Sequence, residues 1–135
     1  MEKSLKKLAY VTDELYRIRE SVMSHPLPEE EVVFLESQAK EGCPMGELLL
    51  CHHRLIHEGD KGMAAELFER FIKHANGPML WGASCDFAYL SDYLRDDDLI
   101  EWSLRCLKRS AWRQFPIAKA MWKDMKEHPF RFPQA

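Results

Sequence analysis

The segment AAELFERFIKHA, residues 64–75, has counterparts 36 residues away on both sides: PEEEVVFLESQA at 28–39 and IEWSLRCLKRSA at 100–111. Large apolar or small residues recur at matching positions of these segments. The sets are Val32, Phe68 and Leu104; Leu35, Phe71 and Leu107; Ala39, Ala75 and Ala111; and, further on, Gly46, Gly82 and Ala118. Pro44 and Pro116 stand two periods apart. A period of this length predicts stacked structural units, each too small to bury its own apolar face.

Apolar residues follow the helical period of 3.6 throughout, and no segment has the alternation of a strand. The segments are punctuated by proline, glycine, asparagine and aspartate, which start or stop helices. We therefore expect an all-α fold in which antiparallel helical hairpins stack as a short right-handed α-solenoid of about seven helices. The predicted single domain, 1–135, comprises hairpins at about 3–41, 44–75 and 78–111, a closing helix at 116–127 and a tail at 128–135.

Composition excludes several classes of partner. The chain is 46% hydrophobic and 30% charged, with a net charge of −3. It has no basic excess for general nucleic-acid binding and no apolar run that could span a membrane. The first residues, MEKSLKK, do not form a secretory signal. We expect a cytoplasmic protein that binds neither nucleic acid nor membranes.

The four cysteines, Cys43, Cys51, Cys85 and Cys106, include no pair at the spacing of a zinc ribbon or a thioredoxin-type site. Two disulfides are formally possible. Reduced and mostly buried thiols fit the cytoplasmic interpretation better.

The segment GCPMGELLL, residues 42–50, followed by EGD at 58–60 and AAELF at 64–68, resembles the Sel-one-like repeat, a relative of the tetratricopeptide repeat. In that family, small residues lie where the two helices of a hairpin cross; Gly46 and Ala64 fit these positions, and Gly59-Asp60 fits the turn. The resemblance is good over about 38–75 and partial over 76–122. In the third unit Asp86 and Phe87 replace the Leu-Gly pair, and Arg95-Asp96-Asp97 replaces the turn.

The resemblance implies an adaptor or scaffold without an active site or cofactor. Such proteins bind a protein or peptide on the concave surface that the first helix of each hairpin lines. On the helix at 44–58 the corresponding candidates are Glu47, His53, Arg54 and His57. On the helices at 78–94 and 116–127 they are Trp81, Asp86, Tyr89, Tyr93, Lys119 and Trp122. Aromatic residues are frequent anchors at protein interfaces, although most of them in a small helical stack belong to the core.

Three alternatives stay open. The protein could be a dedicated bacterial chaperone or immunity-type inhibitor of one partner. It could instead be a metal-binding protein or an enzyme that uses His53 and His57, which share a helix face. Because no third ligand can be identified, and Cys51 points elsewhere on the helix, we expect no metal site. A homodimer is possible, since the apolar stripe of the first helix could form a coiled-coil seam.

Overall fold

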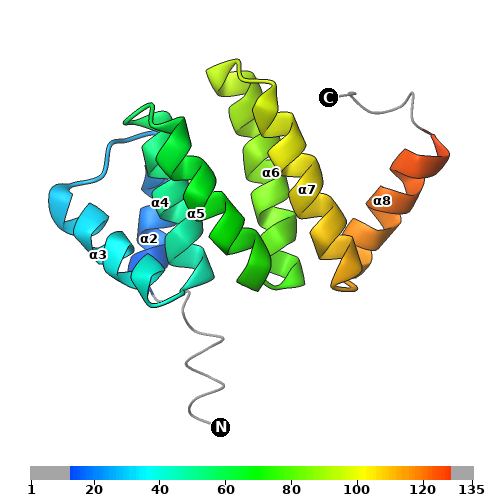
Figure 1. The fold of residues 1–135 in the computed structure, drawn as a ribbon, viewed down its shortest axis with the longest axis horizontal. Coiled ribbons are helices and arrows are strands. Elements are labelled where there is room, and N and C mark those ends of the chain that lie inside the picture. Colours follow the sequence, from blue (N-terminus) through cyan, green and yellow to red (C-terminus); the bar gives the residue numbers. More distant parts are fainter. Residues whose placement is uncertain (1–12, 129–135) are drawn as a thin grey trace, which may run out of the picture. The chain divides into compact units, whose positions relative to one another are not determined.

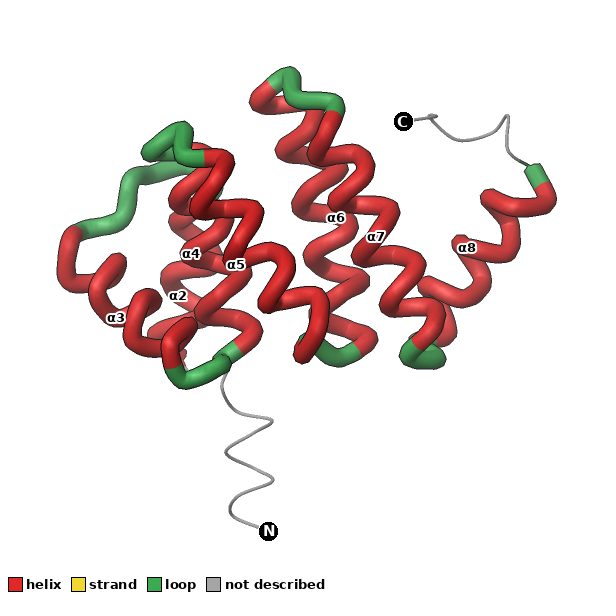
Figure 2. The backbone as a smooth tube through the Cα atoms, viewed as in Figure 1, coloured by secondary structure: helices red, strands yellow, loops and turns green. Residues whose placement is uncertain are grey.

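The computed structural model describes residues 13–128, and these residues form seven α-helices and no strand. The predicted all-α fold with sequential packing of helix pairs is confirmed (Figures 1 and 2). The helices are α2 (Asp13–Val22), α3 (Glu29–Lys40), α4 (Pro44–Ile56), α5 (Lys61–His74), α6 (Gly77–Leu94), α7 (Asp98–Trp112) and α8 (Pro116–Glu127). Residues 1–12, which contain the start of the first predicted helix, and residues 129–135 of the tail lie outside the described part.

Helix boundaries follow from local chemistry. After α3, Gly42 adopts φ +82°, a left-handed conformation that costs glycine little. The side chain of Asn76 accepts a hydrogen bond from the Met79 backbone N–H (2.9 Å) and so caps α6. At the other end of α6, Arg95 takes the left-handed conformation (φ 54°) that glycine usually occupies. The turn between α6 and α7 is therefore closed by a residue that the sequence does not mark as a helix stop.

The chain divides into two compact units, residues 1–74 and 75–135. The single repeat domain expected over residues 1–135 stays a prediction. The first unit contains the described helices α2 to α5, and the second contains α6 to α8.

In the first unit, α4 is the central helix. Each residue from Pro44 to Leu55 is buried, because α2, α3 and α5 all pack against α4. Leu35 of α3 and both Phe68 and Phe71 of α5 are also buried. These three members of the 36-residue pattern, Leu35, Phe68 and Phe71, thus belong to the core of this unit.

The crossing of α3 and α4 depends on the absence of a side chain at Gly46. A Cβ atom added there would lie 2.6 Å from the Gln38 Cβ and 3.3 Å from the Ala39 backbone nitrogen. The small residue that the repeat pattern singled out therefore marks a close approach of two helices.

In the second unit, α6 and α7 are joined by buried serines. Ser84 and Ser103 each donate to the other's backbone carbonyl (2.9 and 2.7 Å), and Ser110 donates to the carbonyl of Gly77 (2.7 Å). Phe87 is fully buried and meets the Trp102 ring edge-on at 5.5 Å. Helix α8 packs on α7 through one face, on which Ala118 is buried.

Within the described part of the chain, no helix is both long and apolar enough to cross a membrane. No disulfide joins the four cysteines, all of which lie in the described part of the chain; Cys43, Cys51 and Cys106 are buried and Cys85 is exposed.

Candidate functional site

An open groove of about 890 Å³ lies in the second unit, lined by side chains of α6, α7 and α8 and of the turn that joins α6 to α7. Its apolar lining consists of Trp81, Ala88, Ile100, Leu104, Leu107, Met121 and Met125. Its other lining residues are Ser84, Cys85, Ser91, Asp92, Arg95, Asp97 and Ser103.

One stripe of α6 forms a wall of the groove. Trp81, Cys85, Ala88 and Asp92 follow one another at intervals of four, three and four residues, so they share a face, and Arg95 continues the lining in the turn after α6. The middle of this wall carries only the small side chains Cys85 and Ala88. The groove is therefore open between the Trp81 ring at one end and charged residues at the other.

The opposite wall comes from α8. Met121 and Met125 are one turn apart and face the groove, and Met121 keeps 36% of its surface exposed. Methionine side chains are flexible and polarisable, which lets them adapt to differently shaped apolar groups. Leu104 and Leu107 of α7 lie between the two walls.

Charge is unevenly distributed along the groove. Asp92, Asp97 and Arg95 line it close to the end of α6, and the Asp96 side chain accepts from the Asp98 backbone N–H (3.0 Å) in the same turn. Carboxylates outnumber the guanidinium at this end. A ligand with an apolar part and a positive charge would match this distribution.

Among the predicted residues of α6 and α8, one lines this groove and the others lie beside it. Trp81 lines it. Tyr89 and Tyr93, each 57% exposed, stack on one another with ring centroids 5.9 Å apart. With Asp86, which is half-buried, they share the next stripe of α6, about 100° around the helix from the groove stripe.

On α8, the predicted residues also lie beside the groove-lining ones. Lys119 is exposed and donates from Nζ to the Oε1 of Gln114 (2.8 Å), and Trp122 is half-buried. Neither belongs to the lining, whose α8 members are Met121 and Met125.

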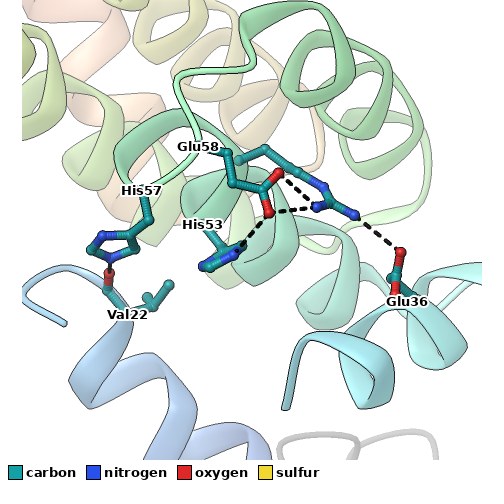
Figure 3. Close-up of polar contacts among 6 residues, drawn as sticks. Val22, Glu36, His53, His57 and Glu58 are labelled. Carbon is teal, nitrogen blue, oxygen red and sulfur yellow. Dashed lines mark hydrogen bonds and ion pairs between the residues drawn. The ribbon is translucent and has the colours of Figure 1, made fainter. Parts of the chain in front are cut away.

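The predicted residues of α4 take part in polar contacts inside the first unit (Figure 3). Arg54 donates from Nη1 to both oxygens of Glu58 at 2.7 Å and from Nη2 to Glu36 of α3 at 3.0 Å. His53 is buried and donates from Nε2 to the same Glu58 carboxylate at 3.1 Å. Arg54 thereby ties α3 to the end of α4.

His57 and Glu47 make further contacts of this kind. The Nε2–H of His57 donates to the Val22 carbonyl at the end of α2 (2.7 Å). Glu47 is only 1% exposed and forms an ion pair with Arg70 of α5 (3.2 Å), which also donates to the Ala39 carbonyl (2.6 Å). All four predicted α4 residues are thus engaged with other elements of their own unit.

Burial and neighbouring charges shift several pKa values in this cluster. Burial lowers the pKa of His53 despite the opposing effect of the Glu58 carboxylate. Hydrogen bonding from Arg54 lowers the pKa of Glu58. Burial raises the pKa of Glu47, although Arg70 works in the other direction. The cluster therefore favours neutral His53 and ionised Glu58.

The His53 and His57 rings are 5.5 Å apart, centroid to centroid, and each directs Nε2 to an oxygen of the protein. Among residues 13–128, no group of three or more His, Cys, Asp or Glu side chains is arranged to hold a metal ion.

Comparison of the chain with known protein families, with curated proteins and with solved structures found no match.

Sequence reasoning missed most of the groove. Two signals could have indicated it: the small residues Cys85 and Ala88 between larger ones at helical spacing, and the two methionines one turn apart on the last helix. Both signals equally fit core packing, which is why only contacts between α6, α7 and α8 reveal their role.

Proposed function

We propose that this protein is a non-catalytic adaptor or scaffold that binds a protein or peptide segment in the groove of its second unit. The observation that carries the proposal is the groove itself: an open, mainly apolar depression with an aromatic ring at one end and charged residues at the other. Binding sites for peptides and small molecules usually combine apolar walls with a few placed polar groups.

The chemistry of the lining supports binding over catalysis. A hydroxyl or thiol nucleophile needs an adjacent base, and the groove lining contains no histidine or lysine; its carboxylates are Asp92 and Asp97, near the end of α6. The hydroxyls of Ser84 and Ser103 are hydrogen-bonded to each other's backbone carbonyls. Burial, followed by the Asp86 carboxylate, raises the pKa of Cys85 and so makes it a poorer nucleophile.

The groove also fits the resemblance to Sel-one-like repeats. In that reading α6 and α8 are the first helices of successive hairpins and supply the walls, while α7 lies between them. Family membership is part of the proposal, as is a cytoplasmic location, which four cysteines that form no disulfide favour. A role of Glu47, His53, Arg54 and His57 in partner binding stays a prediction.

The test is selection of peptides from a random display library on the whole protein, followed by calorimetric titration of the best binders. In the variant Ala88→Arg, a long charged side chain fills the middle of the groove at an exposed position, and we expect affinity to fall at least about tenfold. The matched control is Tyr89→Ala, next in sequence but on the neighbouring stripe of α6. Circular dichroism confirms that both variants fold.

Each result has a distinct meaning. Loss of binding in Ala88→Arg with full binding in Tyr89→Ala supports the groove. The reverse pattern would move the site to the stripe of Asp86, Tyr89 and Tyr93 and overturn the groove proposal. Failure to select any peptide that binds the folded protein would contradict the proposed function as a whole.

A further inference from the structure

Residues 129–135 follow directly after the helix that forms one wall of the groove. Met125 lines the groove, and the described chain ends three residues later at His128. Helix α8 ends on the same side of the second unit as α6, at the top in Figure 1, because the chain reverses direction at each turn. That side is also where Asp92, Arg95 and Asp97 line the groove.

The composition of this segment matches the groove. Its sequence is PFRFPQA, with Phe130 and Phe132 on either side of Arg131. The groove provides apolar walls for aromatic rings, and carboxylates outnumber cations at the end nearer to the segment. Prolines at 129 and 133 disfavour continuation of α8 and favour an extended backbone, which suits a segment that lies along a groove.

We propose that residues 129–135 occupy the groove of the same chain and act as a built-in competitor that an external ligand must displace. The inference rests on the proposed function and adds two features to it. It names the ligand class, a short extended segment with aromatic groups around a basic residue. It also gives the site a regulatory element within the chain.

The segment is long enough for this role. Seven extended residues span up to about 24 Å. The groove stripe from Trp81 to Asp92 covers eleven helical steps, or about 16 Å. The described chain ends three residues after Met125, so a segment of this length that starts there can bring Phe130 and Phe132 to the apolar part of the groove.

The expected occupancy follows from effective concentration. A short tether holds a segment at an effective concentration on the order of 1 mM. If the free peptide binds with a dissociation constant of about 0.1 mM, the ratio of occupied to empty grooves in the full chain is about ten. An external ligand then binds the full chain about tenfold more weakly than it binds a chain without the segment.

Cys85 provides a specific reporter, because it lines the groove and is the exposed cysteine of the four. The experiment measures the rate at which Cys85 reacts with a thiol reagent such as DTNB at fixed pH. The full chain is compared with a variant that stops after His128. We expect the truncated chain to react about tenfold faster, at a rate independent of protein concentration. The synthetic peptide HPFRFPQA should restore protection saturably.

Substitutions in the segment separate its groups while the groove stays intact. Phe130→Ala with Phe132→Ala should accelerate the reaction nearly as much as truncation. Arg131→Glu should accelerate it partially, and more so at low salt, where charge repulsion is less screened. Gln134→Ala is the matched control and should react like the full chain. A Cys85→Ser variant that loses the fast reaction confirms that the signal comes from Cys85.

Three results would overturn the inference. Equal rates for the full and truncated chains, with no protection by HPFRFPQA, contradict occupancy by the segment, while the proposed function survives if peptides selected from the library still protect Cys85. If neither HPFRFPQA nor any peptide selected from the library protects Cys85, both the proposed function and the occupancy of the groove by residues 129–135 are contradicted. Protection of the full chain that grows with protein concentration assigns the segment to the groove of a second copy and overturns its placement in the same chain.

Discussion

Replacement of Gly46 by alanine should destabilise the first unit, although the same change in an ordinary helix is stabilising. A methyl group at this position would lie 2.6 Å from the Gln38 Cβ and 3.3 Å from two backbone atoms of α3. None of these atoms can turn away by rotation of a side chain, so α3 and α4 must separate.

The magnitude follows from two opposing terms. Overpacking of a core contact costs about 1–3 kcal/mol, and the rigid neighbours place this site at the upper end. Alanine gains about 1 kcal/mol over glycine from its higher helix propensity. The net expectation is a loss of about 2 kcal/mol in the free energy of unfolding, measured by urea denaturation followed by circular dichroism.

Gly62→Ala is the matched control. Gly62 lies in α5 of the same unit, and an added Cβ would meet nothing closer than the Asp60 Oδ1 at 3.7 Å. This variant should be as stable as the wild type or more stable, by up to about 1 kcal/mol. Suppose that Gly46→Ala and Gly62→Ala have the same free energy of unfolding and that the slope of this free energy against urea concentration is unchanged. That result would refute the close approach of α3 and α4.

Three further predictions concern buried groups. The pKa of His53 is lowered in the folded state, so the unfolded chain binds its proton more tightly, and stability should fall as pH drops below about 6.5 until the folded pKa is passed. In His53→Gln the loss of stability at low pH should be smaller. The measurement is the urea midpoint of the wild type and of the variant across pH 5–7.5, and parallel plots of midpoint against pH would contradict the prediction. Arg70→Met should cost about 3 kcal/mol at pH 7 because it leaves the Glu47 carboxylate buried without its ion pair. Adding Glu47→Gln should recover most of that loss, and no recovery in the double variant would show that the ion pair is not the cause. Phe87→Ala should cost about 3–5 kcal/mol, read from tryptophan fluorescence, because it empties a fully buried site against an indole ring; a cost below about 1 kcal/mol would contradict that burial.

Helix positions were predictable to within a few residues, because proline, glycine and asparagine act through local geometry. Pro44 and Pro116 begin α4 and α8, as the sequence predicts, and Asn76, which the sequence marks only as part of a helix break, caps α6. Each effect depends on neighbours in the chain and needs no distant partner. Arg95 differs: its left-handed conformation follows from closing the α6–α7 turn and has no sequence signal of its own.

The polar residues of α4 show where sequence reasoning stops. The resemblance placed Glu47, His53 and Arg54 on the concave binding surface, because they lie on the first helix of a hairpin. In the structure they are buried because α2, α3 and α5 pack around α4, and Arg70 of α5 pairs with Glu47 while Glu36 of α3 pairs with Arg54. Pairing across 18 or more residues is a property of packing, and no spacing rule within α4 reveals it.

The sequence by itself determined that the described part of this protein is helical, where most of its helices begin and end, and that Leu35, Phe71 and Leu107 are buried. These features depend on local conformational preferences and on apolar periodicity, which the residues carry with them. Only the tertiary structure decided that α4 is enclosed and that the groove stripe of α6 runs through Cys85 and Ala88 instead of Asp86 and Tyr89. The two stripes are about 100° apart on one helix, and the packing of α7 and α8 determines which of them borders an open groove.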